Sequence, residues 1–268
     1  MYNDHYALAF NPFDKQQLPE KDRFRSRDFN EMTSRLDYLK DTRGIGLFTA
    51  SPGMGKTYAL RCFSKSLNPN LYHMEYICLS TVSVAEFYKQ LCAILGVSSK
   101  GGKPGMFRAI QDQVWYLYHE KRQPLLLAVD EAQYLSTGIL NDLKMILNYG
   151  YDSVNCFTLI LCGESHLNAT LSRPMHEALR QRITVHYNYQ GLSDEESVAY
   201  IVHKLERAGS SKAVIDDAAL RAVAGHAHGN PRLIDNIMSD AVAIGAQTSK
   251  KTIDTEVILA AVNNQNLG

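Results

Sequence analysis

The sequence has no excess of charge of either sign. Its 28 lysine and arginine residues equal its 28 aspartate and glutamate residues, so the overall charge does not indicate a nucleic-acid partner. Any DNA-binding surface must therefore be local. The sequence also lacks an apolar run of about 18 residues and the pattern of a signal peptide. We therefore expect a soluble, cytoplasmic protein without a membrane segment.

Patterns for metal binding and disulfide pairing are missing as well. The five cysteines form no CxxC pair and show no zinc-ligand spacing. They lie in apolar segments, so we expect them to be reduced and buried. His226 and His228 have no carboxylate or cysteine partner at a suitable spacing, which argues against a metal site there. A length of 268 residues, 45% of them hydrophobic, allows one large domain or two of ordinary size.

The clearest motif is Ala-Ser-Pro-Gly-Met-Gly-Lys-Thr at residues 50–57. An apolar, β-prone run precedes it, and an amphipathic helix is predicted after it over 58–67. A strand, a glycine-rich turn and a helix are the context of a P-loop, where backbone N–H groups and the helix dipole hold a phosphate. Lys56 is expected to reach the β- and γ-phosphates of ATP, and the Thr57 hydroxyl to bind Mg²⁺. The residues predicted to bind the nucleotide here are Ser51, Pro52, Gly53, Met54, Gly55, Lys56, Thr57 and Tyr58.

A second motif is the apolar run over 125–129 that leads into Asp130 and Glu131. Such a run is typical of a buried central strand. Its end would present Asp130 to Mg²⁺, usually through water, and Glu131 to the attacking water as general base. Two adjacent acids at a strand end can also be ordinary surface residues. Their position downstream of a P-loop favours the catalytic interpretation.

The predicted elements change character along the chain. Five strands are predicted at 45–49, 72–79, 124–131, 155–161 and 183–189, with helices between them. After residue 191 only helices are predicted, and Ser193 and Glu196 form a capping box that opens the first of them. These helices are expected at 194–208, 216–227, 231–246 and 254–263.

This combination of motifs and elements resembles the AAA+ ATPases. The resemblance implies an α/β fold, with a five-stranded parallel sheet and flanking helices followed by an all-helical lid. We predict an N-terminal arm at 1–30, a nucleotide-binding core at 31–191 and the lid at 192–268. The aromatic residues of the arm either pack on the body of the protein or form a flap beside the adenine.

Two further segments carry the resemblance. Leu-Arg-Gln-Arg-Ile at 179–183 resembles the arginine-finger segment that precedes the last core strand, and the finger matches Arg182, with Arg180 as the fallback. Gly-Asn-Pro-Arg at 229–232 resembles the sensor-2 motif, in which Arg232 points back toward the nucleotide. After the fourth strand, either Glu164 or Ser165 would face the γ-phosphate, and the sequence leaves this choice open.

Within the AAA+ proteins, the sequence resembles the ExeA-like ATPases over nearly its whole length. It opens with Tyr-x-Leu-x-Phe-Asn-Pro-Phe at 6–13, and continues with the P-loop, Val-Asp-Glu-Ala-Gln and the two arginine motifs in the same order. Ala50 departs from the P-loop pattern, which has glycine there, and Glu164 is a second departure. The group includes the secretion protein ExeA and transposon ATPases related to TnsC, TniB and MuB. ExeA continues into a membrane segment, whereas this sequence ends after the predicted lid, so we favour the transposition group.

The resemblance implies an ATPase that uses ATP and Mg²⁺ and binds ATP between core and lid. Because Arg182 would complete the site of a neighbouring subunit, ATP binding would build a ring or helical filament. We expect an ATP-dependent regulator of transposition that binds double-stranded DNA without strong sequence preference and recruits a transposase. Hydrolysis would then dismantle the assembly. A secretion-assembly ATPase without a DNA role and a replication initiator or helicase loader are the alternatives.

The expected DNA contact is a polar loop, Ser-Ser-Lys-Gly-Gly-Lys-Pro-Gly at 98–105. It carries Lys100 and Lys103, and its glycines would allow it to reach a DNA backbone. Repeated around an oligomer, such lysines would bind phosphate rather than read sequence. The alternative is a mobile loop in solvent.

Overall fold

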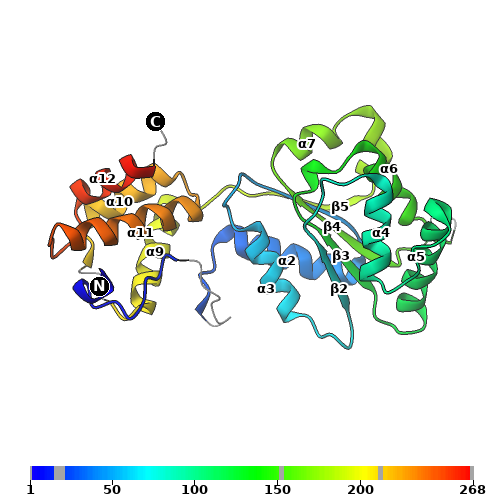
Figure 1. The fold of residues 1–268 in the computed structure, drawn as a ribbon, viewed down its shortest axis with the longest axis horizontal. Coiled ribbons are helices and arrows are strands. Elements are labelled where there is room, and N and C mark those ends of the chain that lie inside the picture. The colour runs from blue at the N-terminus through cyan, green and yellow to red at the C-terminus, as the bar shows by residue number, and fades with distance from the viewer. Residues whose placement is uncertain (1, 15–21, 151–153, 211–213, 266–268) are drawn as a thin grey trace. The chain divides into compact units, whose positions relative to one another are not determined.

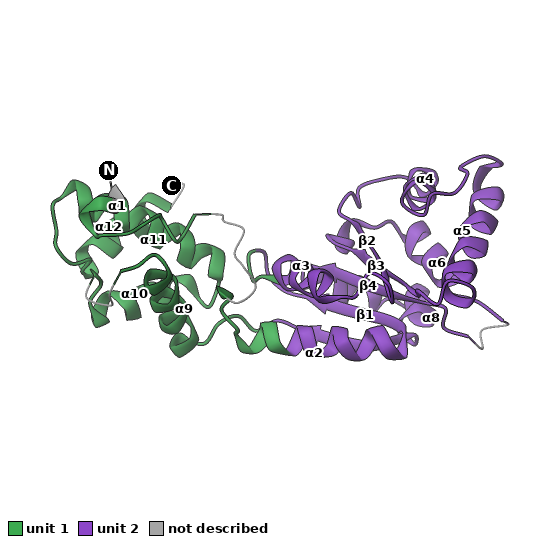
Figure 2. Cartoon of the chain, turned by 90° about the horizontal axis from the view of Figure 1, so that it is seen from below, with its two compact units in different colours: residues 1–30, 53–55, 190–268 green, residues 31–52, 56–189 purple. Residues whose placement is uncertain are grey.

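The computed structural model describes residues 2–14, 22–150, 154–210 and 214–265. The chain divides into two compact units, coloured separately in Figure 2. We call residues 31–52 and 56–189 the α/β unit, and residues 1–30, 53–55 and 190–268 the helical unit. The predicted three-part division at residues 30 and 191 remains a proposal.

The α/β unit is built on a parallel sheet of five strands in the order β2-β3-β4-β1-β5 (Figure 1). This sheet confirms the predicted fold class. The three central strands of this order, β3, β4 and β1, are wholly buried, as apolar runs indicate. The strands are β1 (Gly44–Thr49), β2 (His73–Ile77), β3 (Leu125–Val129), β4 (Phe157–Gly163) and β5 (Ile183–Asn188).

Helices cover both faces of the sheet because alternate strand residues point to opposite sides. Ile45 and Leu47 join the apolar cluster formed with α4, α5 and α6. Leu39 of α2 packs against Gly46 on the other face, the side on which Figure 1 shows α2 and α3. The helices are α2 (Arg27–Thr42), α3 (Lys56–Ser66), α4 (Val84–Ile94), α5 (Gly102–His119), α6 (Thr137–Ile146), α7 (His166–Leu171) and α8 (Glu177–Arg180). Two 3₁₀ turns, η2 (Ala132–Tyr134) and η3 (Pro174–His176), complete the unit.

The helical unit contains the predicted lid helices and also the N-terminal arm. Tyr6, Leu8 and Phe13 of the arm are buried in the same apolar cluster as the lid helices, and the Tyr6 hydroxyl donates to Lys250 O at 3.0 Å. The arm is therefore part of the core of this unit. The helices of the helical unit are α1 (Tyr2–His5), α9 (Asp194–Arg207), α10 (Asp217–Ala227), α11 (Pro231–Gln247) and α12 (Thr255–Gln265). The predicted capping box of Ser193 and Glu196 opens α9.

The expected loop at 98–105 is shorter than predicted, because α5 begins at Gly102. Lys103 lies in the first turn of this helix, where its ammonium group forms an ion pair with Asp142 at 2.7 Å. Pro104 also lies in the first turn, where a missing N–H costs no helical hydrogen bond. The prediction that Lys103 sits in a flexible loop was therefore wrong, whereas Lys100 is exposed ahead of the helix.

One cysteine differs from the expectation of burial. Cys78 is exposed directly after β2, whereas Cys62, Cys92, Cys156 and Cys162 are buried. Among the residues that the structure describes, no helix combines the length and apolar character needed to cross a membrane.

Candidate functional site

The P-loop connects the end of β1 to the start of α3. Gly53 and Gly55 have φ values of 85° and 93°, a region that side chains disfavour, so the turn depends on glycine at these two positions. Ala50 is not among the residues with positive φ. The departure from glycine at position 50 is therefore compatible with the turn.

Lys56 is the first residue of α3 and is buried. Its ammonium group donates to Ala50 O at 3.0 Å and to Ser51 O at 3.4 Å. Burial lowers the pKa of this ammonium group, and nearby acidic groups such as Asp130 act in the opposite direction. The loop's own carbonyl groups thus solvate a buried cation at the position where a phosphate chain would provide a stronger, charged partner.

Asp130 and Thr57, the two residues predicted to bind Mg²⁺, lie within hydrogen-bond distance of each other. The Thr57 hydroxyl donates to Asp130 Oδ2 at 2.7 Å, and Asp130 is buried at the end of β3. The Tyr76 hydroxyl donates to the same carboxylate oxygen at 2.9 Å, and Ser80 Oγ donates to Asp130 O at 2.7 Å. A hydroxyl and a carboxylate are oxygen ligands of the kind that Mg²⁺ prefers, so these residues fit that ion.

Glu131 has a left-handed backbone conformation, with φ 52° and ψ 36°. For a residue other than glycine this conformation is uncommon and is typical of functional sites. The Glu131 amide donates to Asp130 Oδ1 at 3.0 Å. The two adjacent acids differ in burial, since the Asp130 side chain is buried and the Glu131 side chain is exposed.

The Glu131 carboxylate has a partner in η2. Gln133 Nε2 donates to Glu131 Oε2 at 2.6 Å, and Gln133 Oε1 accepts from Glu164 N at 3.0 Å. The Glu164 carboxylate lies 3.5 Å from His166 Nδ1, and Ser165 precedes α7 without a side-chain capping bond. The assignment of the γ-phosphate contact to Glu164 or Ser165 remains a proposal.

A polar cluster that sequence reasoning missed lies at the carboxyl ends of β1 and β5. Asn168 Nδ2 donates to Thr49 Oγ1 at 3.0 Å and to Asn188 Oδ1 at 2.8 Å, and Thr49 also donates to Asn188. Tyr76 and Gln133 were missed as well. Their positions in the sequence could have indicated them. They lie near the carboxyl ends of parallel strands or in the segments that follow, where ligands bind in open α/β sheets.

Arg182 lies between α8 and β5, as its motif predicted. Its guanidinium Nη1 donates to Lys144 O in α6 at 3.1 Å. Arg180 Nη1 donates to Ser172 O at 2.9 Å. The action of Arg182 on a neighbouring subunit remains a prediction.

Arg232 is the second residue of α11. Asn230 caps this helix, and its Oδ1 accepts from Arg232 N at 3.0 Å and from Leu233 N at 3.4 Å. Within the helical unit, a side chain at Gly53 would place its Cβ 2.6 Å from Asn230 Oδ1 and 2.9 Å from Arg232 Cβ. Position 53 therefore also requires glycine because Asn230 and Arg232 leave no space for a Cβ there.

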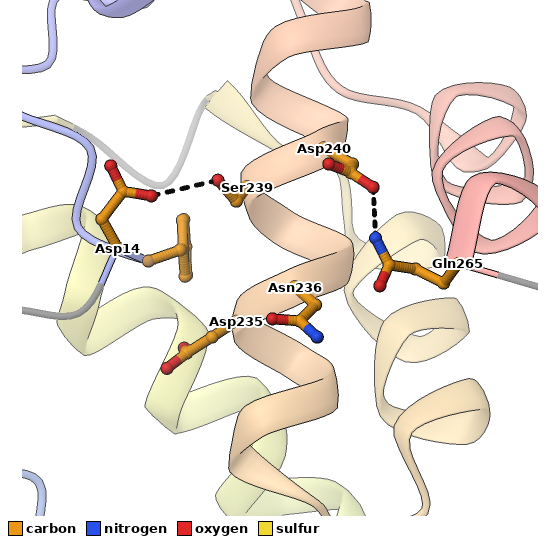
Figure 3. A pocket seen from close by; sticks show the side chains of 7 residues that line it. Asp14, Asp235, Asn236, Ser239, Asp240 and Gln265 are labelled. Carbon is orange, nitrogen blue, oxygen red and sulfur yellow. Dashed lines mark hydrogen bonds between the residues drawn. The ribbon is translucent and has the colours of Figure 1, made fainter.

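The helical unit also contains a pocket of about 420 Å³. It contains none of the predicted site residues. Figure 3 shows Asp14 bonded to Ser239 and Gln265 bonded to Asp240 across it. Asp235 at its wall forms an ion pair with Lys204 at 2.7 Å. The lining residues are Phe13, Asp14, Asp235, Asn236, Ser239, Asp240 and Gln265.

Comparisons with known proteins agree with this fold. Residues 39–171 match the family model described as AAA domain. The chain is 29% identical over 265 residues to General secretion pathway protein A of Aeromonas hydrophila, covering 97% of this chain and 48% of that protein. It is 28% identical over 132 residues to ATP-dependent target DNA activator B of Escherichia phage Mu, covering 48% of this chain and 40% of that protein. The chain thus spans about half the length, or less, of these two relatives.

A solved structure supports the same architecture. The crystal structure of Cdc6p from Pyrobaculum aerophilum superposes with a TM-score of 0.72 at 17% identity, covering 96% of this chain and 71% of that one. At this identity the likeness concerns the fold. Taken with the matched family model, it leads to one conclusion: residues 39–171 resemble an AAA domain, and the chain shares the fold of the solved Cdc6p structure and is similar in sequence to General secretion pathway protein A and to target DNA activator B.

Proposed function

We propose that this protein is an ATP-dependent, DNA-binding regulator of transposition. It assembles on target DNA when it binds ATP, recruits a transposase, and leaves the DNA when ATP is hydrolysed. The observation that carries this proposal is its similarity to ATP-dependent target DNA activator B. The hydrogen bond between Thr57 and Asp130, the two residues proposed to bind Mg²⁺, supports the nucleotide-dependent part of the cycle.

In this cycle, residues 51–58 form the phosphate-binding loop, and the backbone N–H groups of residues 53–58 bind the phosphate chain. Lys56 exchanges the carbonyl groups of Ala50 and Ser51 for the β- and γ-phosphates, because an anion is a stronger partner for a buried ammonium group. Thr57 and Asp130 hold Mg²⁺, which neutralises charge on the phosphates. Glu131 accepts a proton from the attacking water.

Two arginines complete the proposed site. Arg232 binds the phosphates. Arg182 exchanges Lys144 O for the γ-phosphate of a neighbouring subunit. Since the subunit that carries the finger differs from the one that holds the nucleotide, ATP favours assembly into a ring or helical filament.

The proposed DNA contact is formed by Lys100 and Lys103. Lys100 is exposed immediately before α5, so a phosphate can reach it directly. Lys103 must first leave Asp142, which is more deeply buried than the lysine. We therefore assign the larger share of the contact to Lys100.

The test is binding of duplex DNA of unrelated sequences with and without ATP, over a series of salt concentrations. We expect ATP-dependent binding that weakens steeply with salt. The double variant Lys100→Glu, Lys103→Glu should weaken DNA binding and leave ATP binding unchanged. Lys121→Glu, in the exposed segment just beyond α5, is the matched control. If the unmodified protein with ATP bound no DNA at low salt, the transposition role would be excluded.

A second candidate is a secretion-assembly ATPase without a DNA role. The similarity to General secretion pathway protein A favours it, because that match extends over 97% of this chain. Both candidates use the same ATP site, so nucleotide binding does not separate them. ATP hydrolysis that proceeds at one rate with and without DNA, in a protein that binds no DNA, would favour the secretion role.

A further inference from the structure

The Gln133 side chain connects Glu131 to the end of β4. Its amide nitrogen donates to Glu131 Oε2 at 2.6 Å, and its amide oxygen accepts from Glu164 N at 3.0 Å. A backbone N–H can only donate, so the bond from Glu164 requires the amide oxygen on that side. The NH₂ group is then directed at the Glu131 carboxylate. The orientation of the amide is thereby determined by the backbone.

Gly163, the last residue of β4, has no side chain that would occupy the space taken by Gln133. A Cβ added at Gly163 would lie 2.8 Å from Gln133 Oε1 and 3.3 Å from Gln133 N. The glutamine therefore packs directly against the backbone at the end of the strand. This position is fixed by the sheet, because β4 pairs with both β1 and β3.

Glu131 needs such a constraint. Its side chain is exposed, and an exposed glutamate samples several rotamers at a cost in free energy when one of them must be selected. The hydrogen bond from Gln133 occupies one carboxylate oxygen, Oε2. The other oxygen, Oε1, belongs to the same exposed side chain.

We infer that Gln133 is a positioning residue for ATP hydrolysis. Gln133 is itself bonded to Glu164 N beyond the end of β4, and it holds the Glu131 carboxylate in one rotamer. In this rotamer the carboxylate meets the attacking water in a productive geometry. This inference rests on the proposed role of Glu131 as general base. Gln133 itself does not touch the reacting atoms.

The first test compares Gln133→Ala with Gln123→Ala under saturating ATP, Mg²⁺ and DNA. Gln123 is a matched control because its amide also bridges two backbone groups, Pro69 O and Asn70 O, at the opposite end of β3. Gln133→Ala should lower kcat by about ten- to a hundredfold, the effect of a misplaced catalytic group. The KM for ATP should stay within about twofold, since the phosphate-binding residues are unchanged. Gln123→Ala should leave both constants unchanged.

The second test separates the donor from the acceptor. Gln133→Glu keeps the size of the side chain and can still accept from Glu164 N, but it places a carboxylate against Glu131. It should lower kcat at least as strongly as Gln133→Ala. If Gln133→Glu retained full activity, the hydrogen bond to Glu131 would have no part in catalysis and the inference would be overturned.

The third test asks whether Gln133 acts through Glu131. In single-turnover measurements, Gln133→Ala should have little further effect in a Glu131→Gln background, because the general base that Gln133 positions is already lost. A merely structural glutamine would lower the rate equally in both backgrounds. In the nucleotide-free protein, the NMR signals of the Gln133 NH₂ group should shift when Glu131→Gln is introduced, which reports the contact without reference to activity.

The outcomes distinguish this inference from the function on which it rests. If the unmodified protein failed to hydrolyse ATP, or if Glu131→Gln hydrolysed it at the full rate, the role of Glu131 would fall and the positioning role with it. If Glu131→Gln lost hydrolysis while Gln133→Ala kept the full kcat, the positioning role alone would be wrong.

Discussion

At the scale of single residues, Lys56 and Glu131 are expected to act at different steps. Lys56→Ala removes the buried cation beside the phosphate site, and we expect it to abolish ATP binding. Glu131→Gln keeps the size of the side chain but removes the base, so ATP binding should persist while phosphate release stops. Binding of a fluorescent ATP analogue and phosphate release measure the two effects separately. Lys65→Ala, in the last turn of the same helix, is the control and should change neither.

Tyr76 is predicted to support Asp130, the proposed Mg²⁺ ligand. Tyr76→Phe removes the hydroxyl group that donates to Asp130 Oδ2 and leaves the bond from Thr57. Because loss of an outer partner loosens a metal ligand, the Mg²⁺ concentration for half-maximal ATP hydrolysis should rise about tenfold, with a smaller change in kcat. Tyr72→Phe removes a comparable bond to Asp41 at 2.9 Å and should leave the Mg²⁺ dependence unchanged. An unchanged Mg²⁺ dependence in Tyr76→Phe would contradict the supporting role.

Part of the site was predictable at this scale because sequence neighbours define it. Residues 50–57 are contiguous in the sequence, and Thr57 meets Asp130 because β1, which precedes the P-loop, and β3, which precedes Asp130, run parallel in one sheet. Tyr76 and Gln133 were not predictable in the same way. Their roles depend on side-chain directions across neighbouring strands, which periodicity does not specify.

At the scale of elements, one ion pair joins α9 to α11. Lys204 donates to Asp235 at 2.7 Å, and the Tyr200 hydroxyl donates to the same carboxylate at 3.0 Å. Burial lowers the pKa of Lys204 and raises that of Asp235. Both pKa shifts arise because removing a charged group from water costs free energy, and the attraction between the two charges offsets part of that cost.

Breaking this pair should destabilise the helical unit. Lys204→Met leaves the Asp235 charge without its cation, and we expect a loss of about 3 kcal/mol in the free energy of unfolding. Lys250→Met removes an exposed ion pair with Asp254 and Glu256 and should cost less than about 1 kcal/mol. Denaturant titrations followed by circular dichroism compare the two variants. Equal losses would show that the pair between α9 and α11 has no special weight.

The elements that were predicted correctly are those with strong local patterns. β3 was evident because Leu125–Val129 is buried on both faces and therefore apolar throughout. The start of α5 was missed because residues 101–105 contain three glycines, which disfavour helix. Tertiary contacts override that preference, since Met106 is buried in the core and Lys103 pairs with Asp142.

At the scale of the whole molecule, long-range packing was the least predictable property. The aromatic residues at the start of the chain suggested an arm, but nothing local indicated that Tyr6 and Phe13 complete the core of helices more than 180 residues away. Assembly between copies is also a property of this scale. Variants of Arg182 can test it.

Arg182→Ala should reduce ATP hydrolysis by about a thousandfold or more if the arginine stabilises the transition state in a neighbouring subunit. ATP binding by the isolated subunit should stay nearly unchanged. Arg180→Ala, which removes a guanidinium group bonded to Ser172 O, is the matched comparison and should retain most of the activity. The opposite result would move the finger to Arg180.

Mixing experiments then ask whether Arg182 acts between subunits. An Arg182→Ala subunit has an intact nucleotide site but no finger, whereas a Lys56→Ala subunit has a finger but binds no ATP. In a mixed assembly, the second subunit can supply its arginine to the first, so hydrolysis should return in proportion to such neighbouring pairs. Light scattering or crosslinking must first show that the two variants assemble together. If mixed assemblies form and recover no hydrolysis at any ratio, Arg182 does not act on a neighbouring subunit.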